Sequence, residues 1–276
     1  MQISMIVFAV TRCAAVYAAR PVVIEADTQS DYSHILIKRQ GAMRMMIFVR
    51  DNGDEAVESM INTKKPYELI MPYSKYMFAS YFFVPKPTKV LVVGLGGGAM
   101  VQFLRHYDPD VKVDSVEIDG KVVELADKFF QTRNDDHTRI ITDDAFHYFE
   151  TDKNQYDVIY MDAFLKPSGK TDSTGLPLRM KTAKFYKSLQ SKLLPGGVVA
   201  VNLNVQPRTS DDVAILRETY NQVYPFRVTT PNLIVLCTTE SKRLSATELR
   251  ERGKEVDRRI KANFSCAALA GSLMAK

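Results

Sequence analysis

The chain has 276 residues, of which 46% are hydrophobic and 25% are charged, and its formal net charge is +5. A chain of this length and composition buries a substantial core, which excludes an intrinsically disordered protein. The densest basic stretch, residues 242–261, is interleaved with acids, so we expect a solvated helix face there and no nucleic-acid-binding surface.

The first 20 residues leave the location of the protein open. Ile3 to Val10 is a short apolar run followed by small residues, as in a secretory signal peptide. No basic residue precedes the run and Arg12 interrupts it, so we expect a cytoplasmic protein, with export as the alternative if residues 1–20 act as a leader. No run reaches the roughly 18 apolar residues of a membrane-spanning helix, and we expect no membrane association.

The cysteines and histidines predict neither a disulfide framework nor a metal site. The cysteines are odd in number and far apart, and no histidine has metal-ligand spacing. These residues are Cys13, Cys237, Cys266, His34, His106, His137 and His147.

An N-terminal β unit is predicted from short β-branched and aromatic stretches between Val22 and Val49. A helix is expected from Tyr67 to Phe83, ended by Pro85 and Pro87. We therefore place a β unit with its connecting helix at residues 21–85.

A regular alternation of strands and helices follows and predicts a parallel sheet covered by helices on both faces at residues 86–240. Ser245 and Glu248 have the spacing of a capping box, which predicts a helix through Ile260 in a C-terminal helical tail, residues 241–276. The expected strands are residues 90–93, 113–116, 139–142, 156–161, 198–202, 226–229 and 233–237. The expected helices between them are residues 100–106, 121–130, 182–193 and 211–223, with a turn at residues 195–197.

A glycine-rich turn directly follows the first of these strands. In Gly94-Leu95-Gly96-Gly97-Gly98, glycine allows close approach of the backbone to a ligand and presents N–H groups at a helix start. Gly94, Gly96 and Gly97 are therefore candidate cofactor-binding residues. Glycine also serves tight turns for purely conformational reasons.

Carboxylates follow the next two strands. Glu117, with Ile118 beside it, lies about twenty residues after the glycine turn, where a carboxylate binds the hydroxyls of an adenosine ribose. Asp143, Asp144 and Ala145 end the third strand, and Asp144 is placed to reach an adenine edge. Capping of the following helix is the alternative role for Asp144.

Asp162 ends the fourth strand, at the edge where open α/β sheets bind ligands. If the nucleophile is an amine, this carboxylate can orient its lone pair and stabilise the ammonium that forms. A loop cap is the alternative. An NAD-dependent oxidoreductase shares the glycine turn and the acid after the second strand, but Asp162 and the Pro-Gly-Gly turn fit a transferase better.

Together these segments resemble the spermidine synthase (polyamine aminopropyltransferase) family. The resemblance covers about residues 31–237 and implies a Rossmann-like sheet of the class I methyltransferase type behind a small N-terminal β-hairpin domain. It implies Asp162 as catalytic residue, Ser33, Tyr73 and Asp162 as substrate-binding residues, and often a homodimer. It also implies decarboxylated S-adenosylmethionine as donor, no metal, and a small-molecule amine or polyamine as acceptor. The segments that carry it are residues 94–98, 116–119, 143–145, 156–164 and 194–197.

The chain is a divergent member by this comparison, because it lacks several polyamine-binding acids. Gly97 stands where the family usually has an Asp that holds the donor's ammonium, Leu165 stands where a second Asp is usual, and Tyr73-Ser74-Lys75 replaces Tyr-His-Glu or Tyr-Gln-Glu. Asp172 and the Asp211-Asp212 pair are candidate replacements.

These departures leave three functions open. Aminopropyl transfer follows from the family layout, whereas the missing loop acid is consistent with methyl transfer from intact S-adenosylmethionine. A catalytically inactive nucleotide-binding relative is the third. Residues 166–176 are expected to form a mobile lid over the site.

Overall fold

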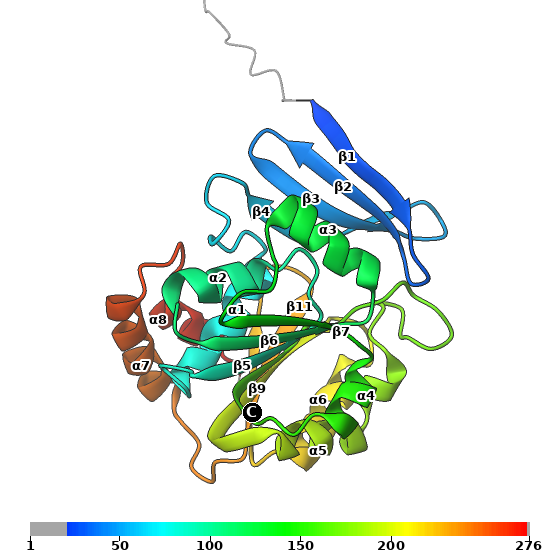
Figure 1. The fold of residues 1–276 in the computed structure, drawn as a ribbon. Coiled ribbons are helices and arrows are strands. Elements are labelled where there is room, and N and C mark those ends of the chain that lie inside the picture. Colours follow the sequence, from blue (N-terminus) through cyan, green and yellow to red (C-terminus); the bar gives the residue numbers. More distant parts are fainter. Residues whose placement is uncertain (1–20, 275–276) are drawn as a thin grey trace, which may run out of the picture.

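The computed structural model describes residues 21–274, so the expected leader at residues 1–20 lies outside the described part. The N-terminal unit is an antiparallel meander in the order β1-β2-β3-β4 (Figure 1). Its inner face buries Ile35, Ile37 and Met46 against Leu125 and Phe130 of a helix from the second unit. The strands are β1 (Val22–Gln29), β2 (His34–Gln40), β3 (Met43–Val49) and β4 (Glu55–Asn62).

The second unit contains a seven-stranded sheet in the order β10-β11-β9-β8-β5-β6-β7. Among these strands β11 alone runs antiparallel to its neighbours. The apolar runs of the central strands are buried on both faces, as parallel sheets require. The strands are β5 (Lys89–Val93), β6 (Lys112–Glu117), β7 (Thr138–Thr142), β8 (Tyr156–Met161), β9 (Leu193–Asn204), β10 (Gln222–Arg227) and β11 (Asn232–Thr238). The fold is thus the expected α/β, Rossmann-like methyltransferase type with an N-terminal β unit.

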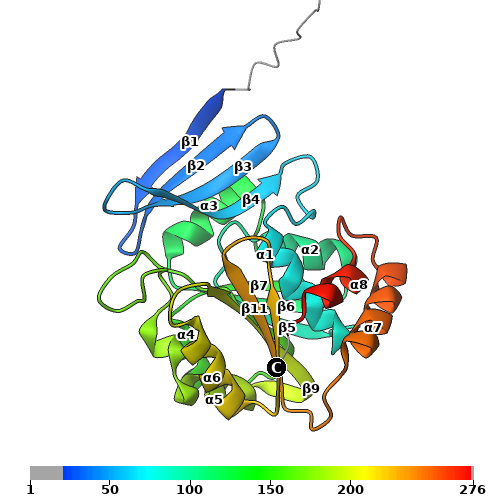
Figure 2. The same ribbon diagram turned by 180° about the vertical axis from the view of Figure 1, so that it is seen from behind.

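Helices cover both faces of the large sheet (Figures 1 and 2), and alternate residues of each strand contribute to two separate cores. The first face carries α1 (Pro72–Met77), α2 (Ala99–Tyr107), α3 (Gly120–Phe130), α7 (Ala246–Arg259) and α8 (Cys266–Leu269), with the 3₁₀ segments Phe78–Phe82 and Ala270–Ser272. The second face carries α4 (Ala145–Thr151), α5 (Ala183–Ser191) and α6 (Thr209–Thr219), and a 3₁₀ segment, Leu178–Lys181, precedes α5.

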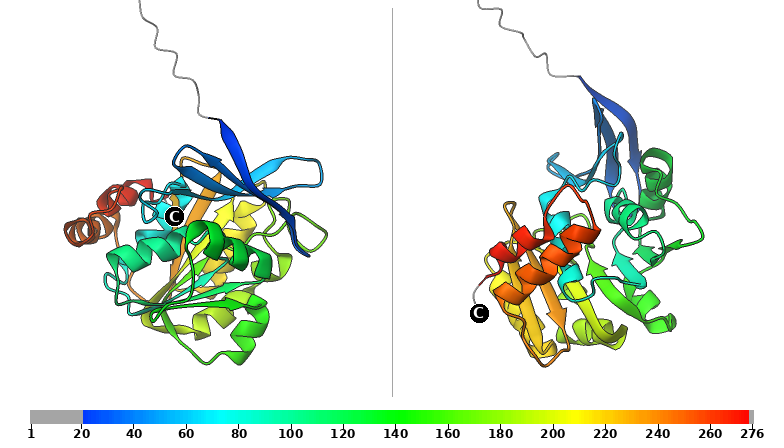
Figure 3. Two further views of the ribbon diagram at one scale, coloured as in Figure 1. Left: turned by 45° about the horizontal axis from the view of Figure 1, so that its top comes forward. Right: turned by 90° about the vertical axis from the view of Figure 1, so that its left-hand side faces the viewer.

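The small sheet caps one end of this large unit, and the C-terminal helices lie on its flank (Figure 3). The predicted capping box is present, because the Ser245 side chain accepts from the Glu248 N–H while Glu248 bonds back to the Ser245 N–H. Within residues 21–274, no helix combines the length and the hydrophobicity needed to cross a lipid bilayer.

Several expected elements differ from the structure. The helix expected at residues 67–83 begins only at Pro72, because a residue before proline disfavours the helical conformation, and it continues as a 3₁₀ segment after Met77. The helix expected to reach Val223 ends at Thr219, and the next strand begins at Gln222 instead of Phe226. Pro225 lies inside that strand, which is tolerated because β10 is at the sheet edge.

The turn expected at residues 195–197 is a bulge within β9. Tyr156 pairs with Leu193, but Val158 already pairs with Val198, so several residues of β9 face one residue of β8. Gly196 adopts φ 79°, which suits glycine and lets the strand continue beyond the bulge.

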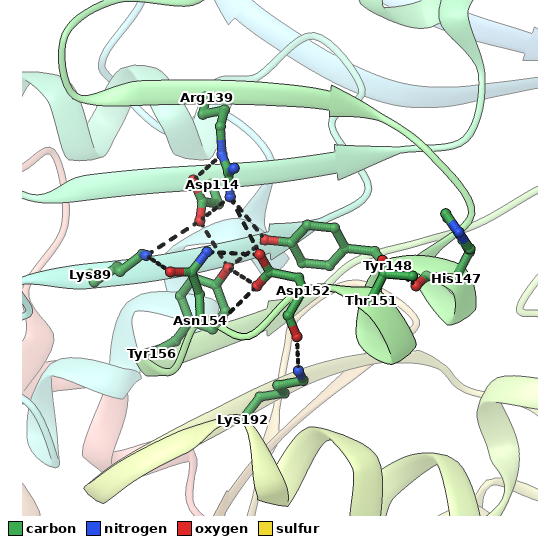
Figure 4. Close-up of polar contacts among 10 residues, drawn as sticks. All are labelled: Lys89, Asp114, Arg139, His147, Tyr148, Thr151, Asp152, Asn154, Tyr156 and Lys192. Carbon is green, nitrogen blue, oxygen red and sulfur yellow. Dashed lines mark hydrogen bonds and ion pairs between the residues drawn. The ribbon is translucent and has the colours of Figure 1, made fainter.

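A charged cluster joins the amino ends of four strands (Figure 4). Asp162 follows the carboxyl end of β8, so the cluster lies at the opposite end of the sheet. Asp114, which is 6% exposed, accepts two hydrogen bonds of 3.0 Å from Arg139 and one of 2.8 Å from the Tyr156 hydroxyl. The Tyr148 and Tyr156 hydroxyls are 2.5 Å apart, and Lys89 Nζ lies 3.8 Å from Asp114. Burial raises the pKa of Tyr156, so its hydroxyl stays protonated. It links the Tyr148 hydroxyl to the Asp114 carboxylate.

We predict that Tyr156→Phe lowers the free energy of unfolding by about 1–3 kcal/mol, because it leaves buried polar groups without a partner. Urea denaturation measures this value. Tyr107→Phe is the matched control, since its hydroxyl bonds only the exposed Lys261 carbonyl, and its effect is expected within about 0.5 kcal/mol. Equal stability of the two variants would contradict a stabilising role for the cluster.

Candidate active site

A cavity of about 930 Å³ lies between the N-terminal sheet and the carboxyl ends of β5, β6, β7 and β8. This size suits a nucleoside with a second small molecule. Nearly all residues predicted from the sequence to bind donor or acceptor line it, and Gly97 does not. Those that line it are Ser33, Tyr73, Gly94, Gly96, Glu117, Ile118, Asp143, Asp144, Ala145 and Asp162.

Gly94 brings the ends of β5 and β8 into contact. A Cβ atom at this position would lie 2.2 Å from the Asp162 carbonyl oxygen, and Gly94 has φ 90°. The Asp162 N–H donates to the Val93 carbonyl at 2.9 Å. The glycine therefore fixes the acid beside the glycine turn, and any side chain there would separate them.

Gly97 faces away from the cavity. A Cβ atom at Gly97 would lie 2.6 Å from the Phe130 ring, and the Gly97 carbonyl accepts a 2.9 Å bond from Thr132. Gly97, near the end of the turn, therefore packs on the end of α3 and is not among the residues that line the cavity, and its cofactor-binding role stays a prediction.

Glu117 is anchored to the glycine turn. Its two oxygens accept bonds from the backbone N–H groups of Leu95 at 2.9 Å and Asp119 at 3.0 Å. Burial raises the pKa of Glu117, and the backbone donors oppose this shift. The Gly96 N–H is a third backbone donor to this carboxylate, and since a carboxylate has about four acceptor sites, about one remains for a hydroxyl of a ribose.

Asp143 and Asp144 have protein partners although both line the cavity. Asp144 caps α4 by accepting from the Phe146 N–H at 2.8 Å, so the capping role left open by the sequence is present. Asp143 accepts from His147 at 2.8 Å and raises the pKa of this imidazole. The contact with an adenine edge stays a prediction.

Asp162 is held by two donors. Asn202 Nδ2 donates to one carboxylate oxygen at 2.8 Å and the Tyr73 hydroxyl donates to the other at 3.1 Å. Burial raises the pKa of Asp162, and these hydrogen bonds oppose the shift. Burial and the charge of Asp162 raise the pKa of Tyr73, which keeps its hydroxyl a donor.

Sequence reasoning missed an asparagine cluster that supports Asp162. Asn232 Nδ2 donates to the side-chain oxygens of Asn202 at 3.1 Å and Asn204 at 2.7 Å. Asn202 is 3% exposed, so its side-chain oxygen, which is turned from solvent, is satisfied by Asn232 while its amide donates to Asp162. The cluster forms through the antiparallel pairing of β9 with β11, which residue spacing alone does not reveal.

Glu58 was also missed. It lies on β4, lines the cavity and is half-buried. Burial and the neighbouring charge of Asp162 raise the pKa of Glu58 to about 7, and Arg50 partly opposes the shift. No strand was expected here from the sequence, so its side-chain direction could not be predicted.

The acids named as replacements lie elsewhere. Lys181 Nζ lies 2.8 Å from Asp172 and 2.9 Å from Asp212, and Asp211 pairs with Arg208 at 2.8 Å. None of these three acids lines the cavity. They therefore add no negative charge to the site.

The segment expected as a lid borders the cavity. The Leu165 N–H donates to the Gly175 carbonyl at 2.9 Å and closes the loop at its base. Lys166 forms an ion pair with Asp51, in the turn between β3 and β4, and thus ties the loop to the small sheet. Within the described residues 21–274, no group of three His, Cys, Asp or Glu residues is placed to hold a metal ion.

Comparison with known proteins identifies relatives of two kinds. A polyamine aminopropyltransferase of Vibrio vulnificus is 26% identical over 206 residues, covering 73% of this chain and 67% of the relative. One of Chromobacterium violaceum is 28% identical over 151 residues, covering 54% and 55%. An eEF1A lysine and N-terminal methyltransferase of Xenopus laevis is 27% identical over 213 residues, covering 70% and 30%. The chain thus matches between about a third and two thirds of the length of these relatives.

Solved structures share the fold. A spermidine synthase in complex with the transition-state analogue AdoDATO has a TM-score of 0.67 at 20% identity, covering 92% of this chain and 85% of that one. Human methyltransferase-like protein 13 in complex with SAH has a TM-score of 0.64 at 24% identity, covering 71% and 95%.

The family itself is shown by the match of a family model to more than half of the chain. The model of the spermine/spermidine synthase domain matches residues 73–256, which include the glycine turn, Glu117 and Asp162. The chain therefore belongs to the spermine/spermidine synthase family.

Proposed function

We propose that this chain transfers the aminopropyl group of decarboxylated S-adenosylmethionine to a small-molecule amine or polyamine. The observation that carries this proposal is Asp162, a half-buried carboxylate fixed by Asn202 and Tyr73 at the carboxyl end of β8. The names of the aminopropyltransferase relatives support it.

The reaction needs little more than orientation and one acceptor of charge. The amine nitrogen attacks the carbon next to the sulfonium, the new N–C bond forms as the C–S bond breaks, and the electron pair leaves with the sulfur of methylthioadenosine. Asp162 accepts a hydrogen bond from the attacking amine and stabilises the ammonium that develops. Its raised pKa brings it closer to the pH at which it can take up the released proton.

The donor nucleoside is proposed to lie along the carboxyl ends of β5, β6 and β7. Gly94 and Gly96 leave room for its backbone contacts, Glu117 accepts from the ribose, and Asp144 with Ala145 borders the adenine. Ser33 closes this side from the small sheet, and its buried hydroxyl has no hydrogen-bond partner within residues 21–274. A hydroxyl of the donor nucleoside would satisfy the Ser33 hydroxyl by a hydrogen bond.

Methyl transfer from intact S-adenosylmethionine is the second candidate. It is favoured by the glycine turn, which carries no acid and packs Gly97 against Phe130, and by methyltransferase relatives that span about 70% of the chain. A homodimer and a cytoplasmic location stay predictions.

Product analysis separates the two reactions. We expect the purified chain to form methylthioadenosine and an aminopropylated amine from the decarboxylated donor and a diamine such as putrescine, detected by mass spectrometry. Formation of S-adenosylhomocysteine and a methylated amine from the intact donor would replace the first proposal by the second. If neither donor is consumed, while methylthioadenosine still binds, the chain is an inactive nucleotide-binding relative.

Two substitutions are expected to separate catalysis from nucleotide binding. Asp162→Asn should abolish turnover and leave methylthioadenosine affinity within a few fold, because the acid acts on the amine. Glu117→Ala should weaken the binding of methylthioadenosine at least about tenfold, because it removes the charged acceptor of ribose hydrogen bonds. Initial rates and calorimetric titration measure both values. Unchanged turnover in Asp162→Asn would remove this residue from the mechanism.

Reinstating the family's loop acid is expected to fail. Gly97→Asp should lower the free energy of unfolding by about 1–3 kcal/mol, because its Cβ meets the Phe130 ring, and should not tighten binding of the decarboxylated donor. Gly271→Asp is the matched control, since open space surrounds that glycine. A stable Gly97→Asp variant with tighter donor binding would place position 97 in the cavity.

A further inference from the structure

Glu58 is the extra residue of a β-bulge. In the pairing of β3 with β4, Met46 faces Ser59 and Ile47 faces Val57, so Glu58 has no partner on the neighbouring strand. Bulges bend a strand and re-aim a side chain, and they are common next to active sites. Here the bulge belongs to the stretch of β4 that lines the cavity.

The bulge lies directly on the glycine turn. A Cβ atom at Gly96 would be 3.5 Å from Ser59 Cβ and 3.9 Å from the Glu58 carbonyl oxygen. The Glu58 carboxylate is close enough to Asp162 and Tyr73 to raise the pKa of Tyr73 and to have its own pKa raised by Asp162. Glu58 therefore borders the same cavity as the turn proposed to seat the donor and the acid proposed to face the amine.

Glu58 has no fixed partner. Within residues 21–274, no hydrogen bond or ion pair closer than 4.0 Å is formed by its carboxylate, and Arg50 acts on it only through its charge. The other acids that line the cavity are bonded or paired, except Asp31, which is exposed. Two facing carboxylates in a half-buried cavity favour a cation between them.

Resting on the proposed function, we propose that Glu58 is the specificity-determining residue that binds the ammonium of the donor's aminopropyl chain. It supplies from β4 the carboxylate that the glycine turn lacks at Gly97. Intact S-adenosylmethionine carries a carboxylate at the carbon that bears this ammonium, and Glu58 would repel it. Glu58 thus selects the decarboxylated donor by attraction and excludes the intact one by repulsion.

The proposal predicts a pH dependence of donor binding. Asp162 after β8, Tyr73 from α1 and Arg50 beyond β3 face Glu58. Burial raises the pKa of Tyr73, so its hydroxyl stays neutral. Because burial raises the pKa of Glu58 to about 7, part of the protein carries a neutral Glu58 at neutral pH. An ammonium binds the ionised form, so donor affinity rises with pH through about 7 and protons are released on binding.

Calorimetric titration of the full chain with decarboxylated S-adenosylmethionine and methylthioadenosine, and of the wild type also with intact S-adenosylmethionine, tests this assignment. Glu58→Gln is expected to lower the affinity for decarboxylated S-adenosylmethionine about 10- to 100-fold, which is the loss expected for one hydrogen bond between charged groups. Methylthioadenosine has no ammonium, so its affinity should stay within about threefold. Glu55→Gln is the matched control, because Glu55 is an exposed acid of the same strand that pairs with Lys38 outside the cavity.

The outcomes are distinct from those of the product assay. If Glu58→Gln lowers the affinity for both nucleosides equally, or for neither, the proposed role of Glu58 is overturned. Aminopropyl transfer is tested separately, by the products of the reaction. Preference of the wild type for intact S-adenosylmethionine overturns the inference as well. If Glu58→Gln does not fold, the wild-type chain decides: pH-independent binding of the decarboxylated donor between about pH 6 and 8 refutes the proposal.

Discussion

The contact between Gly94 and the backbone of Asp162 is the constraint on which the site depends. A Cβ atom would approach the Asp162 carbonyl to 2.2 Å, so no other residue allows β5 and β8 to end side by side. The same turn gives N–H groups to Glu117 and contacts β4 through Gly96. One conformational requirement therefore sets the relative positions of the ribose-binding acid, the catalytic acid and the small sheet.

The second constraint is electrostatic. Asp162 is half-buried, so its charge is costly, and within residues 21–274 it is stabilised by hydrogen bonds from Asn202 and Tyr73 and not by an ion pair. A second acid, Glu58, faces the same space. The neutral side chains of Asn202 and Tyr73 hold the Asp162 carboxylate in place without cancelling its negative charge. This leaves the charge available for a cationic ligand.

The sequence predicted the parts of the site that belong to one continuous strand and its following turn. Gly94, Glu117 and Asp162 each follow a buried apolar run, and parallel strands bring such ends together. It did not predict Asn232 or Glu58, because their positions depend on the pairing of β11 with β9 and on a one-residue bulge in β4. Register is set by packing between strands far apart in the chain, and periodicity within one strand does not reveal it.

Gly97 and Glu58 are best understood together. Where the family usually has an acid on the turn, this chain has a glycine covered by Phe130, the last residue of α3. The space beside the turn is then bordered by β4, whose bulge presents a carboxylate from the opposite wall. Moving the acid from the nucleotide-binding turn to the small sheet makes donor choice depend on how that sheet sits on α3, and hence on the Ile35, Met46 and Phe130 contact between the two units.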